Sequence, residues 1–122
     1  MKFEGTVLEW GEEALMFLED QKNPFVVLFG EEAPDILKEM SIIHDCKGTN
    51  GDPAPGDTFT FGDLTYKITA VGEEAKVTLR ELGHATIKFT ALDTPELPGC
   101  IHLDGPKPTS ADIKVGMKVT IG

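Results

Sequence analysis

Short apolar runs that alternate with polar residues recur along the whole chain and predict a protein built mainly of β-strands. Residues 2–9 and 64–71 are rich in Thr, Val and aromatic side chains and show partial alternation, which is typical of half-buried strands. Residues 25–29 and 86–89 are shorter apolar runs that predict two further strands. Glycine and proline, 21 residues in total (13 + 8), separate these runs, as expected for a fold with many turns.

Two segments predict short helices, and a third can be helix or strand. Residues 73–82 pair side chains at spacings of three and four and are followed by Gly83, a residue that often ends a helix. Residues 33–40 contain Pro34, which suits the first turn of a helix, and Ile36 and Met40 lie four positions apart on one face. For residues 14–18 the periodicity does not decide. We therefore expect one or two short helices beside the strands.

The chain repeats itself with an offset of about 60 residues. Four landmarks recur in the same order, which favours an internal duplication within one domain, with halves 1–62 and 63–122. About three strands from each half can close on the other half and bury both sheet edges. We therefore expect an all-β fold, a closed six-stranded barrel. The matching segments are 11–14 with 72–75, 27–29 with 87–89, 43–44 with 101–102, and 55–62 with 115–122.

Composition and charge narrow the classes of function. A chain of 122 residues is long enough for one domain with its own core. The formal net charge of −10 argues against nucleic acid and anionic membranes as partners, because their phosphates would be repelled. The longest apolar runs are far shorter than a membrane span, and the first residues do not form a signal peptide. We expect a cytoplasmic protein, not inserted in a membrane, whose two cysteines are reduced thiols.

His44 is the candidate chemical centre. It follows the β-branched residues Ile42 and Ile43 and precedes a polar loop, so a strand end would deliver its imidazole to a loop mouth. Such a ring can act as a base, a metal ligand or a nucleophile. In the loop, Lys47 is a charged donor and Gly48 lets backbone amides approach an anion, which suits a phosphate held on the ring. An ordinary surface histidine is the alternative interpretation.

The other two histidines are candidates for supporting roles. His84 follows the expected helix end and can cap that helix, bind a phosphate or orient His44. His102 lies in a strand that echoes the His44 segment, so its role is structural or supports His44. A zinc site is only weakly indicated, because His44 and Cys46 are the one close pair of ligand types. No phosphate-binding loop or dinucleotide-binding glycine pattern occurs, and we expect no metal and no cofactor.

Several separated motifs together point to one family. The most specific is the run Leu-Arg-Glu-Leu-Gly-His at residues 79–84. The others are residues 43–44 followed by Gly48, then 55–57, 69–72, 98–99 before 101–102, and 105–106. In these motifs, which span most of its length, the chain resembles the glucitol/sorbitol-specific enzyme IIA component of the bacterial sugar phosphotransferase system.

The resemblance implies a cytoplasmic phosphocarrier. Members of the family accept a phosphoryl group from the phosphocarrier HPr on a histidine and pass it to a cysteine of the IIB component, and the IIB and IIC parts phosphorylate glucitol as it enters the cell. By motif the phosphorylated residue falls on His44, and the resemblance suggests its Nε2 atom. The family fold is a closed six-stranded barrel with an internal duplication. Two alternatives stay open, a regulatory or binding module of the same fold that carries no phosphate, and a small metal-binding barrel.

Overall fold

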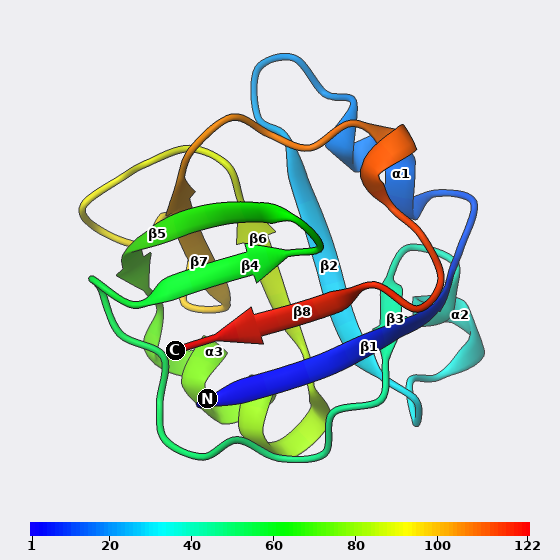
Figure 1. Cartoon of the computed structure of the whole chain (residues 1–122), viewed down its shortest axis with the longest axis horizontal. Coiled ribbons are helices and arrows are strands. Elements are labelled where there is room, and N and C mark those ends of the chain that lie inside the picture. Colours follow the sequence, from blue (N-terminus) through cyan, green and yellow to red (C-terminus); the bar gives the residue numbers. More distant parts are fainter.

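Eight strands form one closed barrel in the computed structural model, which describes all residues 1–122 (Figure 1). The expected number of six strands is wrong, because each half of the chain contributes four. Four of the eight strands are only three or four residues long. Runs of that length show too little alternation for the number of strands to be predicted. In order they are β1 (Phe3–Trp10), β2 (Phe25–Gly30), β3 (Ile42–His44), β4 (Thr58–Phe61), β5 (Leu64–Val71), β6 (Ala85–Lys88), β7 (Cys100–Asp104) and β8 (Lys118–Ile121).

Three short α-helices pack around the barrel, more than the one or two that were expected. The longest, α3 (Glu73–Leu82), confirms the helix predicted for residues 73–82, and Gly83 caps it in the left-handed conformation at φ 67°. The undecided segment forms α1 (Ala14–Leu18), whose two buried residues, Ala14 and Leu18, are one helical turn apart. The remaining elements are α2 (Asp35–Lys38) and a 3-10 turn, η1 (Ser110–Asp112). None of the helices has the length and apolar character needed to span a lipid bilayer.

The order of strands around the barrel is symmetric. It runs β1-β3-β2-β6-β7-β5-β4-β8 and closes back on β1. Exchanging each strand of the first half for its counterpart in the second, β1 for β5 and so on, returns the same neighbouring pairs. The halves meet at four antiparallel pairs, β2–β6, β4–β8, β1–β8 and β4–β5, whereas β2–β3 and β6–β7 are parallel. Each half therefore gives its last strand to the sheet of the other half.

The strand register has the same symmetry. A register shift lies between Val7 and Glu9 of β1, and a second lies 61 positions later, between Ile68 and Ala70 of β5. At the β4–β8 seam Thr60 is paired with Thr120, 60 positions further along the chain, and their hydroxyl groups are hydrogen-bonded to each other. A repeat of about 60 residues leads us to expect this arrangement.

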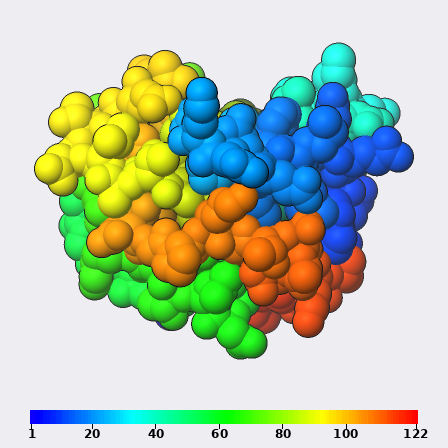
Figure 2. All heavy atoms as spheres, turned by 90° about the horizontal axis from the view of Figure 1, so that it is seen from above, coloured from blue at the N-terminus to red at the C-terminus, as the bar shows by residue number.

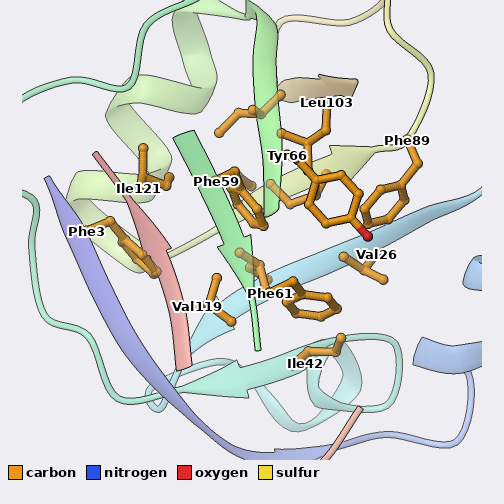
Figure 3. Close-up of a cluster of buried hydrophobic side chains, with 14 of the residues drawn as sticks. Phe3, Val26, Ile42, Phe59, Phe61, Tyr66, Phe89, Leu103, Val119 and Ile121 are labelled. Carbon is orange, nitrogen blue, oxygen red and sulfur yellow. The ribbon is translucent and has the colours of Figure 1, made fainter. Parts of the chain in front are cut away.

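Alternating side chains of the strands fill the barrel with aromatic and branched groups (Figure 3). Every second residue is buried in β4, where Phe59 and Phe61 point inward, and the same alternation buries Tyr66 in β5. The ring of Tyr66 lies 5.4 Å from that of Phe89, between the centroids, and 6.5 Å from that of Phe59. The interior is a packed core of 21 buried residues, so chemistry must take place at the rim.

A long connection between β7 and β8 crosses one face of the molecule. Residues from about 105 to 114 lie across it as the orange band in Figure 2, between the blue segment around α1 and the green β4–β5 hairpin. The Lys107 ammonium donates a hydrogen bond to the carbonyl of Leu18 at 2.9 Å, which joins this band to the end of α1.

Candidate functional site

His44 is the last residue of β3 and is fully buried, with 0% of its surface exposed. Its Cα lies opposite Val7 of β1 and Gly30 of β2, so the strand is paired on both edges at this point. The imidazole also meets the ring of Phe3 edge to face at 4.9 Å. The strand end thus delivers the imidazole as predicted, but to a covered position rather than to an open loop mouth.

Both nitrogens of the His44 ring are hydrogen-bonded to backbone groups. The amide of Cys46 donates to Nδ1 at 3.1 Å, and Nε2 lies 2.8 Å from the carbonyl oxygen of Gly83. An amide N–H can only donate and a carbonyl can only accept, so the ring is the neutral tautomer with its proton on Nε2. Burial lowers the pKa of His44 below 6.5, although the Gly83 carbonyl and the Asp45 carboxylate act in the opposite direction. The ring therefore stays neutral at neutral pH.

The close approach to His44 depends on Gly83. A Cβ atom at this position would lie 2.7 Å from Cε1 and 2.9 Å from Nε2 of the imidazole. The next residue, His84, stacks its ring on Phe29 at 4.5 Å, and its Nδ1 is 3.1 Å from the carbonyl oxygen of Leu28. His84 therefore anchors the turn after α3 to β2. The turn at the C-terminal end of α3 therefore covers the Nε2 side of the ring, while Cys46 of the loop after His44 contacts the Nδ1 side.

A surface hollow of about 150 Å³ lies beside these contacts. It is lined by the two residues whose backbone binds the imidazole, Cys46 and Gly83, and by the predicted donors Lys47 and Gly48. Three exposed carboxylates also line it, so that its charged groups sum to −2 with Lys47 included (1 − 3). The lining residues are Phe29, Gly30, Glu31, Glu32, Cys46, Lys47, Gly48, Glu81, Leu82 and Gly83.

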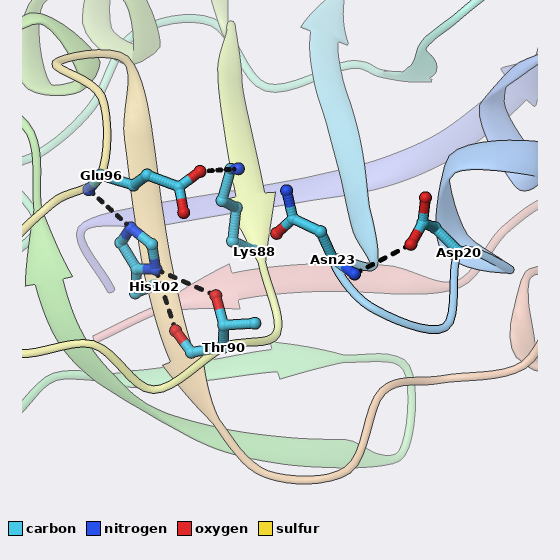
Figure 4. Close-up of polar contacts among 6 residues, drawn as sticks. All are labelled: Asp20, Asn23, Lys88, Thr90, Glu96 and His102. Atoms are coloured by element: carbon cyan, nitrogen blue, oxygen red, sulfur yellow. Dashed lines mark hydrogen bonds and ion pairs between the residues drawn. The ribbon is translucent and has the colours of Figure 1, made fainter.

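His102 lies on β7, the counterpart of β3 in the second half of the barrel, and is also fully buried (Figure 4). Its Nδ1 is 2.9 Å from the carbonyl oxygen of Thr90, and the amide of Glu96 donates to Nε2 at 3.0 Å. These bonds fix the proton on Nδ1 and tie the loop after β6 to β7. His102 makes no hydrogen bond to His44 and does not line the hollow.

The loop over His102 is held by an ion pair as well. The ammonium of Lys88, a residue only 5% exposed, lies 2.6 Å from the Glu96 carboxylate. Hydrogen bonding to Lys88 lowers the pKa of Glu96. Figure 4 shows this pair beside His102, with the Asp20–Asn23 turn nearby, where the Asn23 amide donates to Asp20 at 2.9 Å. The second half therefore has no open hollow at its histidine.

The metal-binding alternative has no geometric support at His44. No group of three or more His, Cys, Asp and Glu side chains comes together in a way that could hold a metal ion. Cys46 and Cys100 are both free, and the Cys46 thiol points to the carbonyl oxygen of Gly48 at 3.3 Å.

The sequence predicted the position of His44 and two of the residues around the hollow, but not the groups that bind the ring. Those groups belong to the backbone of Cys46 and Gly83, and backbone contacts leave no signature of residue type. Gly83 did carry one signal, because a glycine follows the predicted helix and stands inside the most specific motif. Glu31 and Glu32 had no pattern that would have placed them beside His44.

Comparison with known proteins gives consistent matches over nearly the whole chain. The family model described as "PTS system glucitol/sorbitol-specific IIA component" matches residues 2–120. The "PTS system glucitol/sorbitol-specific EIIA component" of Escherichia coli (strain K12) is 40% identical over 107 residues, 87% of this chain and 84% of that protein. The protein of the same description from Shigella flexneri gives the same values. The crystal structure of a PTS system IIA component from Enterococcus faecalis V583 has a TM-score of 0.74 at 28% identity, covering 96% of this chain and 97% of that one.

Proposed function

This chain belongs to the family of glucitol/sorbitol-specific IIA components of the phosphotransferase system, and we propose that it carries a phosphoryl group on His44. The donor would be phospho-HPr and the acceptor a cysteine of the IIB component, which acts with IIC during uptake of the sugar alcohol. The exchange would take place in the cytoplasm. The carrier needs no metal or cofactor of its own for this transfer.

The single observation that carries the proposal is the state of His44. Its imidazole is neutral, because burial lowers its pKa, and its Nε2 faces the Gly83 turn beside a hollow that contains Lys47 and Gly48. A neutral imidazole can attack phosphorus through whichever nitrogen carries no proton, whereas an imidazolium has no such nitrogen. Lys47 and the backbone amides near Gly48 would donate hydrogen bonds to the phosphoryl oxygens.

In each transfer step one bond to phosphorus forms and one breaks. Nε2 first loses its proton to solvent while Nδ1 takes one up. A bond then forms between Nε2 of His44 and phosphorus while the bond from phosphorus to the donor's ring nitrogen breaks, and its electron pair returns to that nitrogen. In the second step the IIB thiolate attacks phosphorus and the Nε2–P electron pair returns to His44. Positioning of the ring by Cys46 and Gly83 and charge compensation by Lys47 are the main contributions expected of this chain.

The experiment is incubation with phosphoenolpyruvate, enzyme I and HPr, followed by intact-mass measurement at alkaline pH, which preserves phosphohistidine. Wild type, His44→Ala and Lys47→Met are compared. We expect one phosphoryl group on the wild type, none on His44→Ala, and slower uptake by Lys47→Met. Label retained in His44→Ala would move the site to His84 or His102.

A binding or regulatory module of the same fold is the second candidate. The complete burial of His44 favours it, because a ring with 0% exposure cannot meet a donor as it stands. The same experiment separates the two functions. Absence of any phosphoryl group on the wild type, with a known IIA component labelled in parallel, would favour the module.

A further inference from the structure

We propose that the Cys46 amide and the Gly83 carbonyl form a tautomer lock, a pair of hydrogen bonds that keeps His44 unable to accept a phosphoryl group at Nε2 until a partner opens it. This inference rests on the proposed function, because it concerns the regulation of the same ring nitrogen. The lock does more than position the ring, because the two hydrogen bonds hold the tautomer that has its proton on Nε2 and cannot react there.

Attack on phosphorus requires a free lone pair on the attacking nitrogen. Nε2 carries the ring proton and donates a hydrogen bond to the carbonyl of Gly83 at 2.8 Å. Nδ1 has the lone pair, but it accepts the Cys46 amide at 3.1 Å and lies against Gly5, where a Cβ would be only 3.1 Å away. Neither nitrogen therefore presents a usable lone pair to a donor.

Opening the lock means moving a proton and rotating a peptide. The proton must leave Nε2 for solvent, and Nδ1 must take one up. An Nδ1–H group would then face the Cys46 N–H, two donors in opposition, unless the Asp45–Cys46 peptide turns. The Asp45 carbonyl that would replace the amide accepts no hydrogen bond from the chain. The Asp45 end of this segment stays anchored during such a turn, because the Asp45 amide donates to the Thr6 carbonyl at 3.2 Å and the Thr6 amide donates to the Asp45 carboxylate at 2.8 Å.

The second half of the lock is within reach of a docking protein. Gly83 lines the hollow together with Glu81 and with Leu82, a residue that is 51% exposed. A partner seated in the hollow would contact this turn directly and could draw the Gly83 carbonyl away from Nε2. Transfer then proceeds with Nε2 bonding phosphorus while Nδ1 keeps the proton. A small phosphorylated molecule has no surface with which to displace the turn, so the lock reserves His44 for a protein donor.

The direct test is nitrogen-15 NMR of the ring-labelled protein, which reports the proton on each imidazole nitrogen. In the free wild type we expect His44 protonated at Nε2 alone, with His102 protonated at Nδ1 as an internal reference of opposite pattern. The variant Cys46→Pro removes the amide proton, and Cys46→Ala is the matched control that keeps it. Cys46→Ala should retain the wild-type tautomer. Cys46→Pro should raise the ratio of Nδ1–H to Nε2–H tautomer, and the rate of phosphoryl uptake from phospho-HPr, about fivefold, the factor for one ordinary net hydrogen bond.

Several outcomes overturn the lock. One is a resting wild type with its His44 proton on Nδ1, a result that needs no variant and holds even if Cys46→Pro does not fold. Another is a folded Cys46→Pro with an unchanged tautomer ratio. The two proposals fail separately: phosphorylation of a wild type that rests with Nδ1–H overturns the lock alone, whereas a locked wild type that never accepts phosphate overturns the carrier function alone.

Discussion

His44 and His102 occupy corresponding strands in the two halves of the barrel, and their imidazole rings are hydrogen-bonded in opposite senses. Nδ1 of His44 accepts a backbone amide, whereas Nδ1 of His102 faces a backbone carbonyl. Nε2 of His44 faces a carbonyl, whereas Nε2 of His102 accepts an amide. The corresponding strands β3 and β7 thus hold histidines in two different tautomers, one beside a hollow and one beneath a closed loop.

The different surroundings predict that His102 matters for stability and not for phosphoryl transfer. His102→Leu would leave the Glu96 amide and the Thr90 carbonyl without partners, and we expect it to lower the free energy of unfolding by about 2–4 kcal/mol. Urea denaturation measures this loss. Phosphoryl uptake, assayed where the variant is folded, should stay near the wild-type rate. A folded His102→Leu that accepts no phosphate would instead give His102 a part in the chemistry.

Burial of His44 should make stability depend on pH. The pKa of its ring is lowered in the folded protein, so between the folded and the unfolded pKa the unfolded chain binds more protons. The contribution of His44 is therefore complete above the unfolded pKa of about 6.5 and declines as the pH falls below it. The urea midpoint measured across this range should fall more steeply in wild type than in His44→Gln. Parallel curves for the two proteins would contradict the buried neutral ring.

Gly83→Ala should cost more than an equivalent change at another left-handed glycine. Gly116→Ala is the matched control, because its φ is 91° and a Cβ there meets nothing within 4 Å. Both variants carry about 1–2 kcal/mol of left-handed strain, but only Gly83→Ala also pushes a methyl group into the His44 imidazole. We expect Gly83→Ala to lose about a further 1–2 kcal/mol and to alter phosphoryl uptake. Equal losses of unfolding free energy in the two variants would show that the His44 imidazole moves aside at no cost, and would contradict the prediction.

The acidic rim of the hollow predicts a basic docking face on the donor. Glu31, Glu32 and Glu81 outnumber Lys47, so attraction to such a face should speed encounter at low salt. Transfer from phospho-HPr should slow severalfold as salt is raised from low to physiological levels, because the Debye length shrinks to about 8 Å. Glu31→Gln should weaken this dependence, and Glu12→Gln, outside the hollow, should not. A transfer rate indifferent to salt would contradict the prediction.

The features of the fold that the sequence predicted are those that depend on residues close together along the chain. The helix at residues 73–82 was predicted in full, because its spacing and its terminal Gly83 are local signals. The number of strands was not, since about three strands were expected from each half and each half has four. The last strand of each half, β4 or β8, is only four residues long and is held by pairing with strands of the other half.

The candidate site divides in the same way. His44 and its loop residues Lys47 and Gly48 are neighbours in sequence, so their association was predictable. The contact of His44 with Gly83 joins residues 39 positions apart and is made by a carbonyl that every residue type possesses. Burial of the ring follows from that tertiary contact, and no local pattern could have indicated it.

The exchange of last strands between the halves has a consequence for chain connectivity. Lys2 donates its amide to the carbonyl of Ile121 at 2.8 Å, and a Cβ built on Gly122 would lie 3.6 Å from the Cα of Met1. The two ends therefore meet at the counterpart of the tight Gly62–Asp63 turn between β4 and β5. A circular permutant that joins Gly122 to Met1 and opens at Asp63 would keep every strand pair, with the two halves merely read in the reverse order.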